Sequence, residues 1–363
     1  MRASVFPLVL LVATISAADD GFVPVFNGRD LNGWVNVDCA PETWGVKEGM
    51  ITCTGKPTGA MRTVRQYENY IFECEWRHLS SGGNAGIFIW AGPISAPGVP
   101  FLRAIEVQVL ENAYGNTEDH TTHGDVFPIH GSTMVPFGKH RGMRSFPSEQ
   151  RSKPTPEWNH YRIEANNGVL RLSVNGKEVS GGEQCVWRKG YLALESEGGP
   201  TEWRNLQLKE LPSRGAKPEE SAPEAQGHRA LYTGLDLRGW KAEAPERWES
   251  ADWRLLLKAG NGNATLATEA EFGDCEIIVD AKLGKPAAEA STAKLTFRGH
   301  EVSLPLSDKW QRFTFQAKKG QLTPVVGEPG SAVVVQLPKE KSAIVLGGGS
   351  AAVEFANIYV REL

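Results

Sequence analysis

After its first residues, the sequence lacks any apolar run approaching the about 18 residues that a membrane-spanning helix needs. It also lacks an excess of basic charge, since 39 Lys and Arg residues are mixed along the chain with 43 Asp and Glu residues. Binding to phosphates or anionic lipids requires clustered positive charge. We therefore expect no membrane span, and neither nucleic acid nor an anionic membrane surface as a partner.

Cysteines are few, and the common catalytic motifs are missing. Five cysteines in 363 residues are too few and too widely spaced for a disulfide scaffold or a four-thiolate metal site, although one or two disulfides remain open. No Gly-x-Ser-x-Gly segment follows an apparent strand, and the glycine clusters do not open helices. These absences argue against esterase, kinase and dehydrogenase activities.

The chain begins with the pattern of a secretory signal peptide. Residues 1–18 contain a basic residue, an apolar stretch and then small residues ending at Ala18. We expect this segment to be cleaved and the protein to be exported to the periplasm or the extracellular space.

A polar, proline-rich segment over residues 212–228 shows no hydrophobic period and is typical of a linker. The sequence FNGRDLNGW at residues 26–34 returns on the other side of it as YTGLDLRGW at residues 232–240. This repeat indicates an internal duplication, with one domain over residues 19–211 and a second, shorter and diverged copy over residues 229–363. The last segments of the two copies are also similar, so we expect the first and last strands of each copy to pair.

Short segments that alternate apolar and polar residues fill both copies. Examples are residues 71–77, 104–110 and 170–174, the last followed by the hairpin turn Asn175-Gly176. No helical stripe longer than about two turns is evident. The sequence therefore predicts an all-β protein of two concanavalin A-like, or jelly-roll, β-sandwiches.

Alternation places Glu106 and Gln108 on one face of their strand and apolar residues on the other. A solvated strand face is the plainer explanation of such a pair. However, a small flexible segment brings Asn84 just before the aromatic residues Phe88 and Trp90. Flat apolar surface together with amide and carboxylate groups is what a sugar-binding site needs.

The long segment between Glu111 and Trp158 is rich in His, Gly and Pro and is too irregular to be scaffold alone. It contains His120, His123 and Asp125, which are residue types that bind divalent metals. Their spacing matches no fixed metal motif, so solvent-exposed histidines are the plainer interpretation. A divalent metal remains one alternative, and no other cofactor is expected.

Several segments occur in the order found in one known family. Together they resemble the 3-keto-disaccharide hydrolase domain over about residues 21–211. The segments that carry this resemblance are FNGRDLNGW at 26–34, WGVKEG at 44–49, NAGIF at 84–88, EVQVL at 106–110, EWNHY at 157–161 and WRNL at 203–206. The resemblance implies a concanavalin A-like sandwich that cleaves glycosides whose sugar is oxidised at C3.

In the chemistry that this family implies, the C3 ketone acidifies the C2 hydrogen, a base removes it, and the C1 leaving group departs before water adds. The resemblance makes Glu106 the base, with Gln108, Asn84 and Arg77 orienting the sugar and its oxyanion. His123 is then a proton donor or a metal ligand.

The chain departs from the family pattern at two positions that we also expect to contact substrate. Trp90 stands where the family often has Arg, and Glu195 lies in LESEG at 194–198, which replaces a usual Leu-Gln-Asp-His-Gly.

The second copy lacks the Glu-x-Gln strand, so we expect it to be non-catalytic. Three functions remain open. The first is cleavage of 3-keto-glycosides, with an oxidoreductase that makes the 3-keto sugar in the same pathway. The second is a secreted, laminin G-like or lectin-like carbohydrate-binding module without catalysis, and the third is a structural role.

Overall fold

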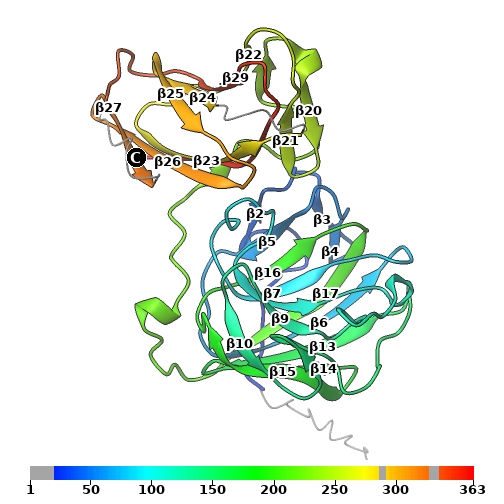
Figure 1. Cartoon of the computed structure of the whole chain (residues 1–363). Coiled ribbons are helices and arrows are strands. Elements are labelled where there is room, and N and C mark those ends of the chain that lie inside the picture. Colours follow the sequence, from blue (N-terminus) through cyan, green and yellow to red (C-terminus); the bar gives the residue numbers. More distant parts are fainter. Residues whose placement is uncertain (1–19, 286–291, 327–334) are drawn as a thin grey trace, which may run out of the picture.

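The computed structural model describes residues 20–285, 292–326 and 335–363 (Figure 1). The expected signal peptide, residues 1–18, lies outside the described residues. Strands dominate the described part of the chain, where only three short 3-10 helices occur, namely η1 (Asn112–Tyr114), η2 (Pro218–Glu220) and η3 (Pro245–Arg247). No helix in these ranges combines the length and apolar character needed to cross a membrane. The prediction of an all-β fold is confirmed.

The first domain is a sandwich of two antiparallel sheets, which we call sheet A and sheet B. Sheet A contains, in spatial order, β10 (Thr133–Pro136), β15 (Lys177–Val186), β14 (Val169–Val174), β13 (Asn159–Asn166), β6 (Tyr70–His78), β17 (Thr201–Glu210), β4 (Met50–Cys53) and β3 (Trp44–Lys47), with β1 (Val23–Pro24) beside β17. Sheet B contains β11 (His140–Arg141), β12 (Arg144–Ser145), β9 (Val126–Ile129), β8 (Ala104–Gln108), β7 (Gly86–Ala91), β16 (Tyr191–Ser196), β5 (Gly59–Thr63) and β2 (Trp34–Val37). Their facing sides enclose a core that includes Ile87, Val107 and Trp203.

The second domain repeats this arrangement with sheets C and D. Sheet C contains β20 (Trp248–Ala251), β21 (Arg254–Leu257), β30 (Val353–Glu362), β23 (Cys275–Leu283), β26 (Gln311–Lys318), β27 (Gln321–Val326) and β28 (Val335–Gln336), with β18 (Arg229–Ala230) beside β30. Sheet D contains β19 (Trp240–Ala242), β22 (Ala264–Thr268), β29 (Ile344–Gly348), β24 (Thr292–Phe297) and β25 (His300–Pro305). A separate core lies between these two sheets.

The strand orders confirm that the second domain is a diverged copy of the first. In sheet A the last strand, β17, lies between β6 and β4, and in sheet C the last strand, β30, lies in the same place between β23 and β21. The opening strands β1 and β18 pair with these last strands in both copies, as the repeat predicted. The Asn175-Gly176 turn is also confirmed, because both residues have positive φ and close the hairpin between β14 and β15.

The segment between Glu111 and Trp158 corrects one expectation, because it is not an irregular loop throughout. It supplies β9, β11 and β12 to the edge of sheet B and β10 to the edge of sheet A. These strands are only two to four residues long and are interrupted by glycine and proline, so no period-two pattern develops. In the second copy β25 connects to β26 through residues 306–310 alone, so this extension is specific to the first.

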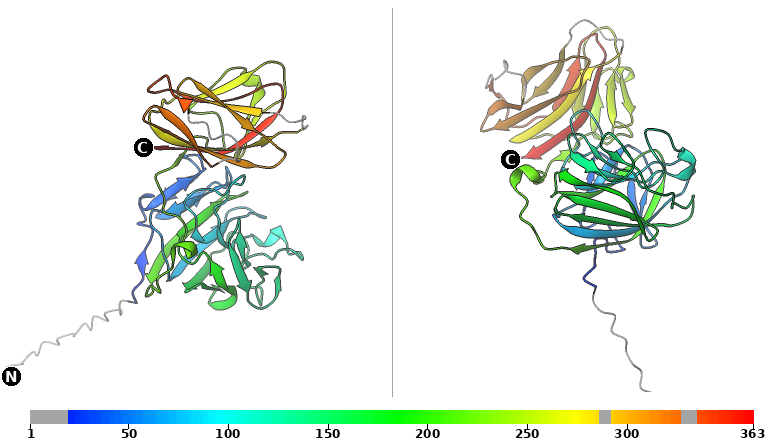
Figure 2. Two further views of the ribbon diagram at one scale, coloured as in Figure 1. Left: turned by 60° about the vertical axis from the view of Figure 1, so that its left-hand side comes forward. Right: turned by 60° about the horizontal axis from the view of Figure 1, so that its bottom comes forward.

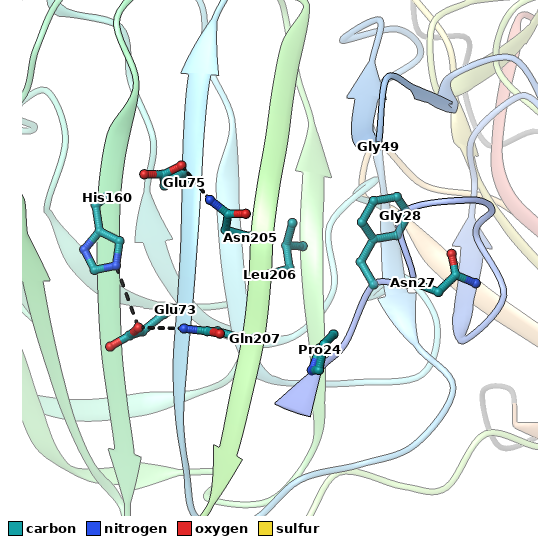
Figure 3. A pocket seen from close by; sticks show the side chains of 11 residues that line it. Pro24, Asn27, Gly28, Gly49, Glu73, Glu75, His160, Asn205, Leu206 and Gln207 are labelled. Atoms are coloured by element: carbon teal, nitrogen blue, oxygen red, sulfur yellow. Dashed lines mark hydrogen bonds and ion pairs between the residues drawn. The ribbon is translucent and has the colours of Figure 1, made fainter. Parts of the chain in front are cut away.

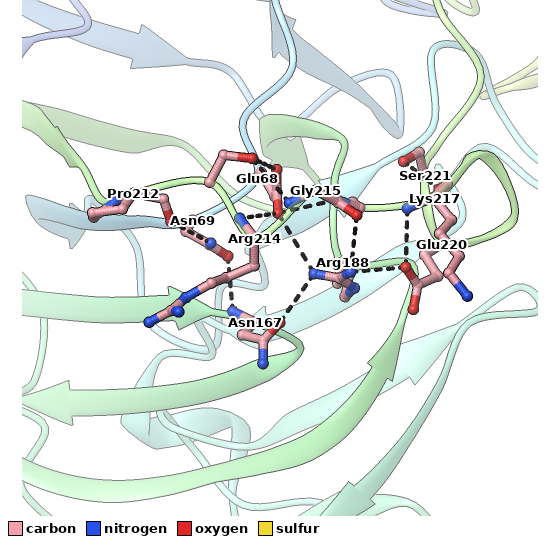
Figure 4. A network of polar contacts seen from close by, with 12 residues as sticks. Glu68, Asn69, Asn167, Arg188, Pro212, Arg214, Gly215, Lys217, Glu220 and Ser221 are labelled. Atoms are coloured by element: carbon pink, nitrogen blue, oxygen red, sulfur yellow. Dashed lines mark hydrogen bonds and ion pairs between the residues drawn. The ribbon is translucent and has the colours of Figure 1, made fainter.

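The linker, residues 212–228, is bound to the surface of the first domain by polar contacts (Figure 4). The Glu68 carboxylate accepts hydrogen bonds from the backbone amides of Arg214 and Ala216, at 2.9 and 3.2 Å. Arg188 then pairs with Glu220 at 2.8 Å. These contacts fix the path of the chain between the two domains, a result that the polar composition of the segment did not indicate.

The two domains are stacked end to end, with the second against the part of the first that carries the loops near β2 and β5 (Figure 2). A buried polar network joins them. Asp280 accepts hydrogen bonds from Arg312 at 2.7 Å and from the amide of Gly98 at 2.7 Å. Asp38 of the first domain accepts from the hydroxyl of Tyr359 in the second. Satisfied buried polar groups of this kind fix one relative arrangement of the parts they connect.

Candidate active site

The outer face of sheet B carries the candidate site, and strand pleating determines which residues reach it. In β8, Ile105 and Val107 point into the core, whereas Glu106 and Gln108 point to the opposite face, as predicted. Glu106 pairs across the sheet with Phe88 of β7 and Phe127 of β9, so the carboxyl group lies in a row between two aromatic side chains.

Glu106 and Glu195 approach each other across the Cα of Gly86. A Cβ atom at Gly86 would lie 2.8 Å from Glu195 Oε2 and 3.1 Å from Glu106 Oε1. Both carboxyl groups are buried, at 7% and 1% exposure, and Glu195 Oε2 has no hydrogen-bond partner among the described residues. The missing side chain of Gly86 is therefore what allows the two acids to approach. The expectation that Glu195 belongs to the site agrees with this geometry.

A third carboxyl group, that of Glu197, extends the pair toward the domain boundary. The side-chain amide of Asn84 donates a hydrogen bond to Glu197, and Gln108 Nε2 donates to Asn84 Oδ1 at 3.0 Å. Gln108 also reaches the carbonyl oxygen of Ala85 at 3.3 Å. A series of hydrogen bonds, which we call the polar chain, thus runs from Gln108 on β8 through Asn84 to Glu197. It includes the two amide residues that the sequence predicted for the site.

Burial is the first cause of a raised pKa in all three acids, and repulsion from neighbouring carboxyl groups adds to it. Burial raises the pKa of Glu106 to about 8, with a further contribution from Glu197. The pKa of Glu197 rises to about 7, chiefly through burial and against the hydrogen bond from Asn84. Burial raises the pKa of Glu195 well above its ordinary value, and no nearby cation opposes the change. Such a cluster retains protons at neutral pH, which gives it both an acid and a base.

Arg144 is a member of the site that sequence reasoning missed. Its guanidinium lies 3.4 Å from the centre of the Phe127 ring, and its charge lowers the pKa of Glu106. It also pairs with the fully buried Asp125 at 2.9 Å. Arg144 lies on β12, far from Glu106 along the chain, so no local spacing pointed to it. Asp125 therefore positions this cation instead of serving as a metal ligand.

Two predicted substrate-binding residues lie elsewhere. Arg77 belongs to sheet A, where it pairs with Glu202 at 2.6 Å and lies 4.6 Å from the centre of the Trp158 ring. Trp90 is fully buried in the core, and its indole nitrogen donates to the carbonyl oxygen of Glu68 at 2.8 Å. Trp90 has a positive φ where the register between β7 and β16 shifts, so simple alternation assigned it to the wrong face.

The histidines do not form a metal site with Asp125. His123 packs against Trp76 of the core with ring centres 4.7 Å apart, and burial lowers the pKa of its imidazole well below the usual value. It therefore stays neutral, and the expected role as a proton donor beside Glu106 is corrected. His120 contacts the hydroxyl of Thr117 at 3.0 Å in the loop after η1. Across the described ranges no group of three or more His, Cys, Asp or Glu residues has a metal-binding arrangement.

The outer face of sheet A contains a separate polar pocket of about 510 Å³ (Figure 3). Its acids are already paired, because Glu73 accepts from Gln207 at 3.1 Å and Glu75 accepts from Asn205 at 2.9 Å. The acids on sheet B differ from these, because burial removes their solvation and hydrogen bonds do not fully replace it.

All five cysteines are buried free thiols, and neither of the disulfides that the sequence left open is present.

Solved structures with a similar arrangement of strands are distant in sequence. A candidate glycosyl hydrolase from Parabacteroides distasonis ATCC 8503 is 19% identical, covers 53% of this chain and 94% of its own, and has a TM-score of 0.42. The carbohydrate-binding module CBM66 from Bacillus subtilis is 12% identical, covers 49% and 96%, and has a TM-score of 0.35. Similarities this low carry no functional argument. No curated protein matches the chain.

The family comparison covers the domain that contains the carboxyl cluster. The 3-keto-alpha-glucoside-1,2-lyase-like domain matches residues 21–209, which is more than half of the chain. This match confirms the resemblance expected from the ordered segments and supports a glycosidase-like role in carbohydrate chemistry. The chain is a member of the 3-keto-alpha-glucoside-1,2-lyase-like domain family.

Proposed function

We propose that the first domain cleaves glycosides whose sugar is oxidised at C3, by removing the C2 proton and eliminating the C1 substituent. The observation that carries this proposal is the cluster of the buried Glu106 and Glu195 with the half-buried Glu197, whose pKa values are all raised. Perturbed acids grouped on one face are a mark of catalytic sites, whereas a passive sugar-binding face has no need of them.

Glu106 is the base in this proposal. Arg144 favours its ionised form, and the same guanidinium is placed to stabilise negative charge on the C3 oxygen as the C2 proton leaves. The electron pair of the C2–H bond forms the enolate of the ketone. Arg144 thus takes the part that the sequence had given to Arg77.

Glu197 is the proton donor, so the reactive form is the singly protonated cluster in which Glu106 is ionised and the proton lies on Glu197. Because the pKa of Glu106, about 8, is above that of Glu197, about 7, this is the less populated of the two singly protonated forms, and the charge of Arg144 favours it. When the enolate collapses, a C1–C2 double bond forms, the C1–O bond breaks, and the leaving oxygen takes the proton of Glu197. Water then adds to C1: Glu197 takes a proton from the water as the hydroxyl group joins C1, and Glu106 returns to C2 the proton that it removed. The sum is hydrolysis of the glycoside, and both carboxyl groups return to their starting states.

Asn84, Gln108 and Phe127 hold the sugar in this proposal. The amides offer hydrogen bonds to ring hydroxyls, and Phe127, half-buried beside Glu106, offers an apolar surface for the ring. Burial raises the pKa of Glu195 well above its ordinary value, so in this proposal it keeps its proton and adds no negative charge beside Glu106.

The test is product release from 3-keto-glucosides and from their unoxidised parents, by wild type and by Glu106→Gln. Turnover of the keto substrates alone, lost in the variant, supports elimination. In deuterium oxide, incorporation of deuterium at C2 of recovered substrate or product reports the proton-removal step directly. Sugar binding without any turnover would overturn the proposal in favour of a carbohydrate-binding module.

Two further expectations remain proposals. We infer export to the periplasm or extracellular space from the signal peptide pattern, and cell fractionation with N-terminal sequencing of the mature protein tests it. The substrate also requires an oxidoreductase that converts the C3 hydroxyl of a glycoside to a ketone, because the proposed chemistry starts from that ketone.

A further inference from the structure

A cavity of about 420 Å³ lies at the junction of the two domains. Its volume falls within the about 300–1,000 Å³ typical of small-molecule sites. The two domains contribute equally to its walls: the first provides Gly55, Lys56, Thr58 and Gly198, and the second provides Gly234, Leu235, Ser250 and Asp252.

This cavity adjoins the carboxyl cluster. Gly198, in its wall, directly follows Glu197, and the charge of Asp252 contributes to the raised pKa of Glu197. The Asn84 backbone bridges to both Glu197 and Gly198, so the end of the polar chain and the edge of the cavity are one continuous structure. The second domain therefore approaches the site at the acid that donates the proton to the leaving group.

The second domain's wall is held in place by several contacts. Asp252 accepts hydrogen bonds from the amide and the hydroxyl of Thr58, at 2.8 and 2.7 Å. The hydroxyl of Tyr232 contacts Ser250 Oγ at 2.6 Å and donates to the carbonyl oxygen of Asp252 at 3.0 Å. A Cβ at Gly234 would lie 2.4 Å from Cβ of Pro57, so the backbone at Gly234 packs directly against the Pro57 ring. A wall fixed in this way positions a ligand more accurately than a mobile loop does.

The lining suits a ring that carries hydroxyl groups. Each oxygen of Asp252 retains acceptor capacity after binding Thr58, Ser250 can donate or accept, and the exposed Lys56 supplies donors. Leu235, 39% exposed, adds an apolar surface against which one face of a ring can pack. Polar groups around a flat apolar surface are the combination that recognises a pyranose.

We propose that this cavity binds the leaving group of the substrate, a second sugar ring, and that the second domain thereby selects disaccharides over glycosides with small substituents. The inference rests on the proposed function, because it assigns the part of the substrate beyond the bond that is cleaved. It also gives the diverged copy a role in specificity without any catalytic residue of its own.

The experiment compares a 3-keto-disaccharide with methyl 3-keto-glucoside as substrates of the full chain. Asp252→Ala removes an acceptor, and Leu235→Trp fills the cavity from an exposed position where a larger side chain leaves folding intact. We expect each variant to lower the ratio of kcat/KM for the disaccharide to kcat/KM for the methyl glycoside about tenfold, mainly through the KM for the disaccharide. Leu235→Trp should leave the methyl glycoside within about twofold, whereas Asp252→Ala also removes a charge that acts on Glu197 and is judged by the ratio alone. Asp308→Ala, which changes an exposed residue of the second domain outside the cavity, is the matched control.

Equal losses for both substrates in both variants, or no loss in either, would overturn the inference. Binding of the same two ligands to Glu106→Gln protein, measured by calorimetry, separates the two proposals. One outcome is that wild type shows no turnover, while disaccharide binding is still weakened by the changes at Asp252 and Leu235. That result overturns the proposed function but retains the cavity as the site for the second ring. Absence of binding by either ligand overturns both.

Discussion

The two copies of the sandwich share their strand order but differ on one face. In the first copy β16 ends in Glu195 and Ser196, whereas in the second the corresponding strand, β29, ends in Gly347 and Gly348. The acids of sheet B are buried, whereas on sheet D Lys294 and Glu301 form an ion pair at 2.9 Å on a partly exposed surface. A shallow pocket of about 60 Å³ is present there.

The difference between the copies shows that the residues that stabilise the fold and the residues of the candidate site are different sets. Each core depends on inward-facing apolar residues, which both copies retain. The outward-facing residues contribute little to either core, so they can change from buried acids to glycines without loss of the fold. The first copy has in addition the extension that carries Arg144, and the second copy has no counterpart to it in the described residues between β25 and β26.

The largest expected effect contrasts one glutamate in each copy. Glu106→Gln should lower kcat/KM on a 3-keto-glucoside by about 10²- to 10⁴-fold, because an amide cannot remove the C2 proton. Glu301→Gln, on sheet D, should leave turnover unchanged. Circular dichroism and thermal melting check that both variants are folded, and equal activity of the two variants would contradict the assignment of the site to the first copy.

A somewhat smaller effect is expected from the cation beside the cluster. Arg144→Gln should lower kcat about 10²- to 10³-fold by removing the group that stabilises the enolate.

The pH profile offers a second test of the same cation. In wild type, kcat/KM should rise as pH passes about 7, where the cluster loses the first of its coupled protons, and fall above about 8, where it loses the second. The higher of the two pKa values, about 8, is that of Glu106, and Arg144 lowers it, so loss of Arg144 should move the alkaline limb to higher pH. An unchanged limb would argue against their proximity.

Gly86→Ala should lower turnover by about 10²-fold, because the added methyl group displaces Glu195 and Glu106 from each other. The second copy offers a matched control in Gly349→Ala, where nothing lies within 4 Å of the added atom. Comparison of steady-state kinetics for the two variants separates a steric effect at the site from the general effect of replacing glycine. A fully active Gly86→Ala protein would show that the acids do not need this spacing.

The smallest effect concerns the contact between the copies. Tyr359→Phe removes a hydrogen bond to the buried Asp38 and should lower the free energy of unfolding by about 1–3 kcal/mol. Denaturant titration should then show the two cores unfolding less cooperatively. Tyr114→Phe, at an exposed position in η1, is the control.

The same contact has a predictable pH dependence. Burial raises the pKa of Asp38 from 3.8 to about 6, so the docked state binds a proton more strongly than the open state does. Stability from this group should be fully present below about 3.8 and should be lost as pH rises through about 6. Asp38→Asn should remove that trend between the two pH values, and an unaltered trend would assign it to other groups.

Much of the fold could be predicted from the sequence because strand alternation is local. The period-two pattern correctly placed Glu106 and Gln108 opposite Ile105 and Val107, and the repeated opening segment predicted the duplicated topology. The pattern failed at Trp90, because a register shift in β7 changes the direction of the side chain and leaves no sign in the residue types.

The histidine-rich segment shows that residue type alone does not predict which side chains are buried. A histidine in a polar, glycine-rich stretch reads as exposed and titratable, yet His123 packs on Trp76 in the core. Glu197 stands where the family usually has His, so the resemblance gave a signal for it that composition alone did not. Arg144 and Asp252 had no such signal, because each comes from a segment distant in sequence.

The sequence by itself determined the all-β class, the duplication and the face on which Glu106 lies, since hydrophobic period and turn residues act over a few positions. Only the tertiary structure decided which charges surround that acid. A pKa depends on burial and on charges within a few ångströms. Those distances follow from the pairing of β7, β8 and β16 and from the docking of the second domain, and no local pattern encodes them.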